Sequence, residues 1–382
     1  MKSVYLDNAS TTQVEPAVIE QISEIMALGP SNPSSLHGTG RVARKYVDTA
    51  TEKIGNCLNT KLDEPGGARL VFTSSGTEAN NLILRGFSNS RRLIISRIEH
   101  PSVIGVGRWL ERTGQRVDWI DVKKSGVICL EHLKFLLESD NSGEALVSTM
   151  WGNNETGVIQ PVEKIADLCR IHHAKFHVDA TQCVGKLPID LSGNPMTAIT
   201  FSAHKFHGPA GVGAAWLAGG ASIEPIMYGG EQQLETRPGT EPVALIFGMA
   251  EALELATKSM VHNGKHCMAL RDQLEFALED SFPEIVVHGK SEERLPGTSC
   301  ISFCGADRQS MLMALDFEGV ACSSGSACSS GSSPPSHVLQ AMQCTKAEID
   351  GALRFAVSKF STAKEIDFAV ERISKVYRRL RR

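Results

Sequence analysis

Between residues 69 and 180 the sequence repeats one pattern, a short apolar run of strand length followed by a longer amphipathic run. The apolar runs cover residues 69–73, 93–96, 117–121, 145–150 and 176–180. The helical patterns between them lie near residues 77–87, 101–112, 130–138 and 162–173. Because repeated strand–helix units require right-handed crossovers, the pattern predicts an α/β fold with a mostly parallel sheet covered by helices on both faces.

The chain extends beyond this alternation at both ends. Before it, residues 16–28 and 41–58 have helical periodicity, and the Gly-, Pro- and Ser-rich residues 29–40 predict a loop. After Gly239 a helical stretch runs to about residue 282. Shorter elements follow, with strands expected at 284–288, 298–303 and 352–358 and helices at 307–317 and 363–381. Because 382 residues are many for one core, we predict a large domain over residues 13–255 and a smaller α+β domain over 1–12 and 256–382.

The composition excludes several classes of protein. A net charge of −4 gives no basic surface, so we expect no direct nucleic-acid partner. Since no apolar run is long enough to cross a bilayer and the N-terminal residues have no signal-peptide pattern, we expect no membrane association and a cytoplasmic location. Ten cysteines without a C-x-x-C pair then indicate free thiols, and Cys300 and Cys304 are interpreted as core thiols, so no metal site is expected.

Two residues at predicted strand ends indicate a cofactor. Lys205 follows an apolar run at 199–201 and precedes a Gly-Pro turn. A lysine held there can lose hydration, which lowers its pKa and makes it a Schiff-base nucleophile, although a lone lysine in such a turn is more often solvated. Asp179 ends an earlier run, so both side chains fall at the carboxyl edge of the sheet, where ligands bind. The pair matches pyridoxal phosphate, which needs a lysine for attachment and a carboxylate at its ring nitrogen.

A phosphate site is expected if this cofactor binds. Residues 73–80, with the sequence TSSGTEAN, end a strand in a Ser/Gly turn and begin a helix near Thr77. Backbone N–H groups at a helix N-terminus bind dianions, and the hydroxyls of Thr77 and Ser202 can add hydrogen bonds. Alone, this turn is equally typical of an ordinary helix N-cap.

The order of these motifs along the chain carries more information than each motif alone. A Ser/Gly-Thr turn is followed by Glu99-His100, Asn153-Asn154-Glu155, Asp179 with Gln182, and residues 202–205 with the sequence SAHK. This order resembles the fold-type I pyridoxal-phosphate enzymes and, among them, the class V aminotransferase-like group. The resemblance implies that His100 stacks on the cofactor ring and that Asn154 and Gln182 face its phenolic oxygen. It further implies phosphate contacts from Gly76, Thr77, Ser202 and His204, and from Thr240 of a neighbouring subunit, hence a homodimer.

The reaction type depends on a Ser/Gly-rich tract. Residues 322–336 contain the sequence SSGSACSSGS, which places Cys328 in a segment with little preference for one conformation. A free thiol is only about 3% thiolate at pH 7, so Cys328 needs a base or a cation nearby to act as a nucleophile. On composition alone, a disordered linker with an incidental cysteine is the favoured interpretation. Cys322, a second thiol beside the tract, could form a disulfide or accept sulfur, but an inert thiol is the simpler interpretation.

Further motifs change the interpretation of this tract. With the sequences YLDNA at 5–9, SNPSS at 31–35, HVDATQ at 177–182 and LPID at 187–190, it resembles the cysteine desulfurases of the NifS/IscS type. The resemblance implies conversion of L-cysteine to L-alanine, a persulfide on Cys328 and sulfur transfer to an acceptor such as an iron–sulfur scaffold or a tRNA-thiolation relay. It implies Lys205 and His100 as catalytic residues, and Arg354 with Asn154 as substrate-binding residues.

This chain also departs from the pattern of that family. Ser10 replaces a usual threonine, and the strand around Arg354 lacks the usual serine and glycine, which puts substrate fit in question. Two alternatives stay open: a selenocysteine lyase or another carbon–sulfur lyase that uses the same residues, and a scaffold that docks sulfur acceptors without turnover.

Overall fold

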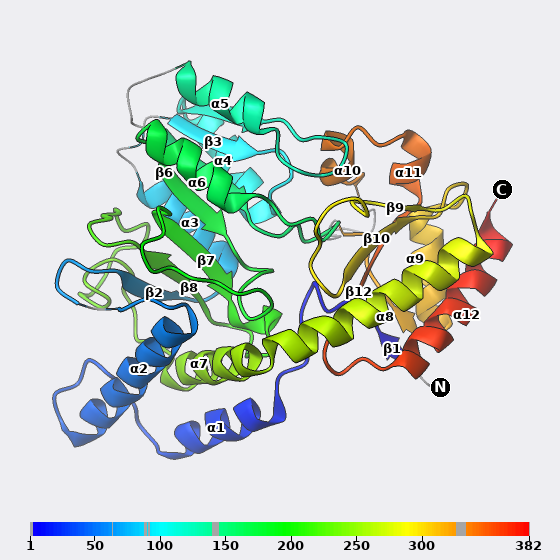
Figure 1. Cartoon of the computed structure of the whole chain (residues 1–382). Helices are drawn as coiled ribbons and strands as arrows, with labels where there is room; N and C mark the ends of the chain where they lie inside the picture. The colour runs from blue at the N-terminus through cyan, green and yellow to red at the C-terminus, as the bar shows by residue number, and fades with distance from the viewer. Residues whose placement is uncertain are drawn as a thin grey trace.

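The computed structural model describes residues 3–62, 64–87, 90, 92–139, 145–325 and 334–381. The largest sheet among these residues has seven strands and lies in the left-hand part of Figure 1. The strand order is β2 (Arg69–Thr73), β8 (Gly213–Leu217), β7 (Ala198–Ser202), β6 (Lys175–Asp179), β5 (Ala145–Met150), β3 (Arg92–Ser96) and β4 (Arg116–Ile120). The strands from β7 to β4 are parallel, and β8 runs antiparallel to both of its neighbours. The predicted mostly parallel α/β sheet is therefore confirmed.

Helices cover both faces of this sheet, because successive strand residues point to opposite sides. In β3, Leu93 and Ile95 pack with α3 (Gly76–Gly86) and α4 (Pro101–Arg112). Ile94, between them, packs into a larger core on the other face. Buried residues of five helices share that core: α1 (Pro16–Ala27), α2 (Gly38–Cys57), α5 (Leu130–Glu138), α6 (Val162–Ile171) and α7 (Val243–Lys258).

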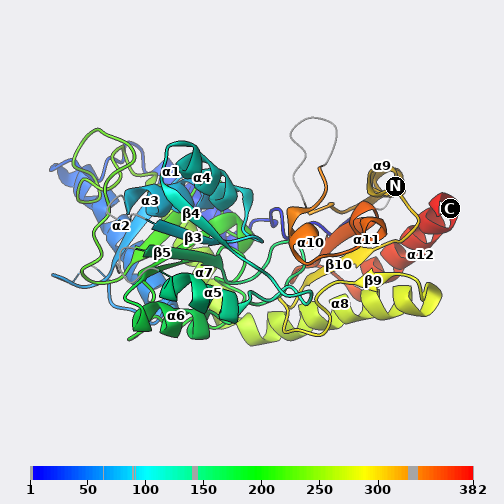
Figure 2. The same ribbon diagram turned by 90° about the horizontal axis from the view of Figure 1, so that it is seen from above.

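A second group of elements lies beside the large sheet (Figure 2). Its antiparallel sheet has the order β12 (Ala352–Ala356), β10 (Thr298–Ser302) and β9 (Val286–Val287). Three helices share one apolar core with this sheet: α8 (Met260–Ser281), α9 (Arg308–Phe317) and α12 (Ala363–Leu380). Two short helices, α10 (His337–Ala341) and α11 (Lys346–Asp350), precede β12.

The N-terminal segment joins this second group. β1 (Val4–Tyr5) pairs in parallel with β11 (Val320–Ala321), and Leu6 lies in the same core as β12. Val4, Tyr5 and Leu6 therefore contact this group, whereas the Ala9 and Ser10 backbone oxygens accept hydrogen bonds from Lys205. The expected boundary after residue 255 falls inside α7, and the division into domains stays a prediction.

The structure corrects three local expectations. Residues 38–40 are not loop, because α2 begins at Gly38 and the His37 side chain accepts a hydrogen bond from the Gly40 N–H. The helical stretch before residue 282 is two helices that meet at Ser259. The sequence pattern missed β8, since GAAWL has few β-branched residues and its strand state depends on pairing with β2 and β7.

No helix among the described residues is long and apolar enough to span a membrane.

Candidate active site

A cavity of about 860 Å³ opens at the carboxyl edge of the large sheet and is completed by residues of the second group. Its volume lies in the range of roughly 300–1,000 Å³ that is typical of small-molecule sites. The predicted site residues that line it are Gly76, Thr77, His100, Asn154, Asp179, Gln182, Ser202, His204, Lys205 and Arg354. Thr240 is exposed and does not belong to this lining. Cys328 lies outside the described residues.

Asp179 is the last residue of β6 and is held there by neighbours on other elements. Its Oδ1 accepts a hydrogen bond from the Thr181 N–H at 3.0 Å, and its Oδ2 accepts one from Asn80 Nδ2 at 2.8 Å. Asn80 lies in α3, directly after the Ser/Gly turn. The carboxylate is buried, and both contacts orient it at the floor of the cavity.

A buried chain of hydrogen bonds supports Asn80 from behind. Ser148 Oγ lies 2.8 Å from His177 Nδ1, and His177 Nε2 lies 3.0 Å from Thr200 Oγ1, which donates to Asn80 Oδ1 at 2.5 Å. Burial lowers the pKa of His177 to about 4, so its ring is neutral and can accept at Nδ1 and donate at Nε2. With this tautomer, the hydrogen-bond donors of the chain run from Ser148 through His177, Thr200 and Asn80 to the Asp179 carboxyl group.

Lys205 ends a 3-10 turn, η1 (Ala203–Lys205), that directly follows β7. Its Nζ donates to the backbone oxygens of Ala9 at 2.8 Å and Ser10 at 2.6 Å. Burial lowers the pKa of Lys205 to about 7, with further lowering by the nearby Lys186 and Arg354 cations. A large fraction of this amine is therefore neutral at pH 7, as a nucleophile or a base requires.

The turn before α3 has the features of an anion site. Ser75 caps the helix by accepting a hydrogen bond from the Glu78 N–H at 3.2 Å, and Gly76 and Thr77 begin the helix at the cavity. Close packing fixes this turn, since a Cβ at Gly213 of β8 would come 2.6 Å from the Ser75 carbonyl carbon. Glu78 turns away from the cavity to pair with Arg237, so its charge does not compete with a bound anion.

His100 and Gln182 border the cavity between this turn and Lys205. His100 caps α4, and its Nδ1 accepts from the Ser102 N–H at 3.1 Å and lies 2.8 Å from Ser102 Oγ. Surrounding protein atoms lower the pKa of His100 by desolvation, with help from the Lys205 cation. Gln182 is buried and donates from Nε2 to the Ala9 backbone oxygen at 2.8 Å.

Arg354 enters the cavity from β12, and its guanidinium is held by two other segments. Nη2 donates to Asp7 Oδ1 at 2.7 Å and to Ser10 Oγ at 2.6 Å, and Nη1 donates to the Asn154 backbone oxygen at 2.9 Å. Its buried Nε has no hydrogen-bond partner within the described ranges. Ser10, which departs from the family pattern, therefore retains the hydroxyl that contacts Arg354.

The two ends of the Ser/Gly-rich tract are anchored at the same cavity. At one end, the backbone of Ser323 pairs with that of Arg354 in an isolated antiparallel β-bridge. At the other end, Ser336 Oγ donates a hydrogen bond to the buried Glu155 carboxylate at 2.5 Å. Gly325 packs so close to Glu155 that a Cβ at Gly325 would come 2.9 Å from its carboxylate. Burial strongly raises the pKa of the Cys322 thiol beside them, which agrees with an inert thiol.

Several residues of this site had no assigned role at the level of sequence. Asn80 contacts Asp179 and Glu155 contacts Ser336, partners that are far away along the chain, whereas Lys186 contacts Gln182 four residues before it. Asn80 and Glu155 do lie inside the motifs that carried the resemblance. No spacing in the sequence indicates which of their neighbours they contact.

Comparison with known proteins bears on the family of this chain. A family model described as aminotransferase class-V matches residues 4–368. A cysteine desulfurase from Cereibacter sphaeroides is 39% identical over 100% of this chain and 97% of its own length. The cysteine desulfurase NifS from Azotobacter vinelandii is 36% identical over 100% of this chain and 94% of its own length.

A solved structure gives the same result at the level of the fold. The NifS-like protein from Rickettsia africae superposes with a TM-score of 0.90 at 32% identity, covering 98% of this chain and 99% of its own. The chain therefore belongs to the aminotransferase class-V family and, within it, to the cysteine desulfurases. The resemblance predicted from the sequence motifs is confirmed.

Proposed function

We propose that this enzyme uses pyridoxal phosphate to convert L-cysteine to L-alanine and leaves the sulfur as a persulfide on Cys328. The observation that carries the proposal is a single cavity lined by Lys205, Asp179 and Arg354. Both ends of the Ser/Gly-rich tract that contains Cys328, hereafter the Cys328 tract, also line this cavity. Its family membership supports the same reaction.

The residues present fit the cofactor. Gly76 and Thr77 at the α3 N-terminus, with the Ser202 hydroxyl and His204, would hold the phosphate. Asp179, an acceptor at the end of a directed hydrogen-bond chain, would hold the protonated ring nitrogen. His100 would stack on the ring. When bound, pyridoxal phosphate supplies an electron sink for the substrate Cα.

The chain's own residues would then act on L-cysteine in three ways. Arg354, with Asn154, binds and orients the substrate carboxylate, a task suited to a guanidinium fork. Lys205 or His100 removes the Cα proton, since both side chains border the cavity and have lowered pKa values. Gln182 donates a hydrogen bond toward the phenolic oxygen of the ring.

Cys328 would complete the reaction. Its thiolate attacks the sulfur of the bound cysteine, the carbon–sulfur bond breaks, the carbon takes up a proton, and alanine leaves. Gly325 precedes Cys328 in the chain and Pro334 follows it, and both residues line the cavity. Gly325 lies three residues before Cys328, a stretch of chain that spans at most about 11 Å. That span is short enough for the thiol to meet a substrate in the cavity.

The wider role follows from the same family. We propose sulfur transfer from Cys328 to an acceptor protein, such as an iron–sulfur cluster scaffold or a thiolation relay. We also propose a homodimer in which Thr240, exposed on its own subunit, contacts the cofactor phosphate of the partner. A cytoplasmic location, where thiols stay reduced, fits the free state of the nine cysteines that are described.

Mass analysis of the intact protein after incubation with L-cysteine tests the proposal. We expect one added sulfur that maps to Cys328, with alanine released in equal amount at the first turnover. Cys328→Ser should keep the absorbance of the bound cofactor and lose the added sulfur, whereas Cys322→Ser should keep both. Sulfur added to another cysteine, or a protein that binds no pyridoxal phosphate, would contradict the proposal.

A further inference from the structure

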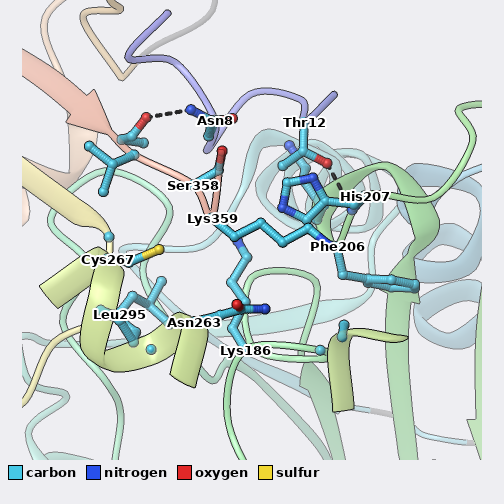
Figure 3. Close-up of a pocket in the computed structure, with 18 of the residues that line it drawn as sticks. Asn8, Thr12, Lys186, Phe206, His207, Asn263, Cys267, Leu295, Ser358 and Lys359 are labelled. Carbon is cyan, nitrogen blue, oxygen red and sulfur yellow. Dashed lines mark hydrogen bonds between the residues drawn. The ribbon is translucent and has the colours of Figure 1, made fainter. Parts of the chain in front are cut away.

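A second, smaller cavity also borders Lys205, and it is shown in Figure 3. Its lining includes Lys186, the α8 residues Asn263 and Cys267, and Lys359, which follows β12. Its volume is about 70 Å³, against about 860 Å³ for the main cavity. The side chains that separate this small cavity from the main one bear directly on the active site.

Lys186 connects the small cavity to the main one through Gln182. Lys186 Nζ donates to Gln182 Oε1 at 2.9 Å, and Gln182 lines the main cavity. Because an ammonium group can only donate, this contact fixes the amide oxygen of Gln182 on the side of Lys186. The amide nitrogen must then face the other way, where it donates to the Ala9 backbone oxygen at 2.8 Å. The same oxygen accepts from Lys205 Nζ at 2.8 Å.

Lys186 also places a charge near Lys205. Burial lowers the pKa of Lys186 to about 8, so this side chain is a cation in most molecules at pH 7. Among the groups that face Lys205, the Lys186 and Arg354 cations disfavour its protonation, and Asp179 and Asp7 favour it. His100 and His204 also lie close, and burial lowers the pKa of both rings, to about 4 for His204.

We propose that Lys186 is a positioning residue for the reaction: it holds the Gln182 amide with its N–H donor toward the main cavity and places a positive charge beside the Lys205 amine. The second contribution needs no cofactor, since it acts on Lys205 of the chain itself. The first rests on the proposed function, because the Gln182 donor has a target there only when the cofactor is bound.

The test compares three variants with the wild-type protein. Lys186→Met removes the charge and the hydrogen bond but keeps an unbranched side chain. Lys186→Arg keeps the charge and a donor, and the small cavity leaves space for the larger group. Lys359→Met is the matched control, because Lys359 lines the same cavity but pairs with Glu15, and the charges that shift the pKa of Lys205 are those of Lys186, Arg354, Asp179 and Asp7.

The first measurement is the rate at which an amine-reactive reagent labels Lys205 in the cofactor-free protein, followed by peptide mass spectrometry across pH. We expect the midpoint to rise by about one pH unit in Lys186→Met, as for loss of a neighbouring charge, with a labelling rate at pH 7 several-fold lower. Lys186→Arg and Lys359→Met should titrate like the wild type. An unchanged midpoint in Lys186→Met overturns the charge contribution.

The second measurement is the pH dependence of the absorbance of the bound cofactor. We expect Lys186→Met to shift the midpoint of this absorbance change and to bind the cofactor several-fold more weakly. Lys186→Arg should have the midpoint and the cofactor affinity of the wild type. Unchanged affinity in Lys186→Met overturns the role in orienting Gln182. A wild-type protein that binds no cofactor overturns the proposed function instead, and the labelling result still stands. If Lys186→Met does not fold, Lys186→Gln removes the same charge and is judged by the same labelling criterion.

Discussion

The two walls of the active-site cavity are built in different ways. The wall formed by the large sheet takes its polar groups from the ends of neighbouring strands and the start of α3, as in Asp179 and its partner Asn80. The opposite wall takes Arg354 and the ends of the Cys328 tract from the C-terminal part of the chain. Arg354 is held by Asp7 and by the Asn154 backbone, which lie hundreds of residues away in sequence.

This difference separates two tasks. The sheet wall contains a chain of buried hydrogen bonds that ends at the Asp179 carboxyl group, which suits a group that must stay fixed. The opposite wall holds one cation and anchors two ends of a segment, which suits binding a substrate and delivering a thiol to it. We therefore expect damage to the sheet wall to affect cofactor binding, and damage to the opposite wall to affect cysteine and sulfur.

The largest effect should come from Lys205→Ala, which removes the amine proposed both to attach the cofactor and to act on the bound cysteine. Alanine formation should fall by at least about 10³-fold, because the variant loses the nucleophilic amine that attaches the cofactor, which the alternative base His100 cannot replace. The measurements are alanine release and the absorbance of the bound cofactor. Lys164→Ala, at an exposed position on α6, is the control and should change neither. Residual activity above one tenth of the wild type would argue against this role.

The next largest effect should follow Arg354→Lys, which keeps the charge and removes the planar fork. We expect KM for cysteine to rise roughly 10- to 100-fold with a smaller fall in kcat, since a charge-assisted bidentate contact is worth about 1.5–3 kcal/mol. Steady-state kinetics measure the two constants separately. Cofactor affinity should stay unchanged, and a variant that loses cofactor rather than substrate affinity would contradict the division between the two walls.

Asn80→Ala tests the sheet wall and should lower cofactor affinity rather than cysteine affinity. The Asp179 carboxylate loses one hydrogen bond and Thr200 loses its acceptor, so cofactor affinity should fall about tenfold or more while KM for cysteine changes little. Asn81→Ala is the matched control, because Asn81 is the next residue of α3 and, within the described part of the chain, its side chain donates only to the Thr77 backbone oxygen, at an exposed position. Absorbance titration gives the affinity, and equal values for the two variants would remove Asn80 from the site.

The lowered pKa of Lys205 predicts a pH dependence for cofactor uptake by the cofactor-free protein. Only the neutral amine reacts, so the rate should rise about tenfold between pH 6 and pH 8 and level off above its pKa of about 7. A lysine with an ordinary pKa near 10.4 would instead give a rise of about a hundredfold with no plateau. Stopped-flow absorbance distinguishes the two curves.

The smallest effect should come from Glu155, which anchors the ends of the Cys328 tract. Glu155→Ala loses the Ser336 hydrogen bond, and we expect the rate of persulfide formation to fall by about tenfold or less. Glu155→Gln can still accept that bond and should lie closer to the wild type. Rapid quenching with mass analysis follows the persulfide, and the cofactor absorbance should be the same in both variants. A loss of cofactor would assign Glu155 to the other wall.

Sequence analysis predicted the parallel strands and the helices between them because each has its own periodicity. It also selected Lys205 and Asp179, since strand ends in such a sheet meet at one edge. It missed β8, whose small residues carry no strand signal, and it placed residues 38–40 in a loop although α2 begins at Gly38. For β8, pairing with two neighbouring strands outweighed the local preference, whereas α2 begins at Gly38 because the His37 side chain caps it.

The sequence by itself determined the α/β fold, the family and the residue types that carry the chemistry, because these depend on local patterns and on the order of motifs. Only the tertiary structure decided that Asn80 holds Asp179, that Asp7 and Ser10 hold Arg354, and that Lys186 contacts Gln182 beside Lys205. Three of these four contacts join segments that are far apart along the chain, and the fourth depends on which way one amide is turned. The physical reason is that hydrogen bonds and charges act through space, over a few ångströms, whatever the number of residues between their partners.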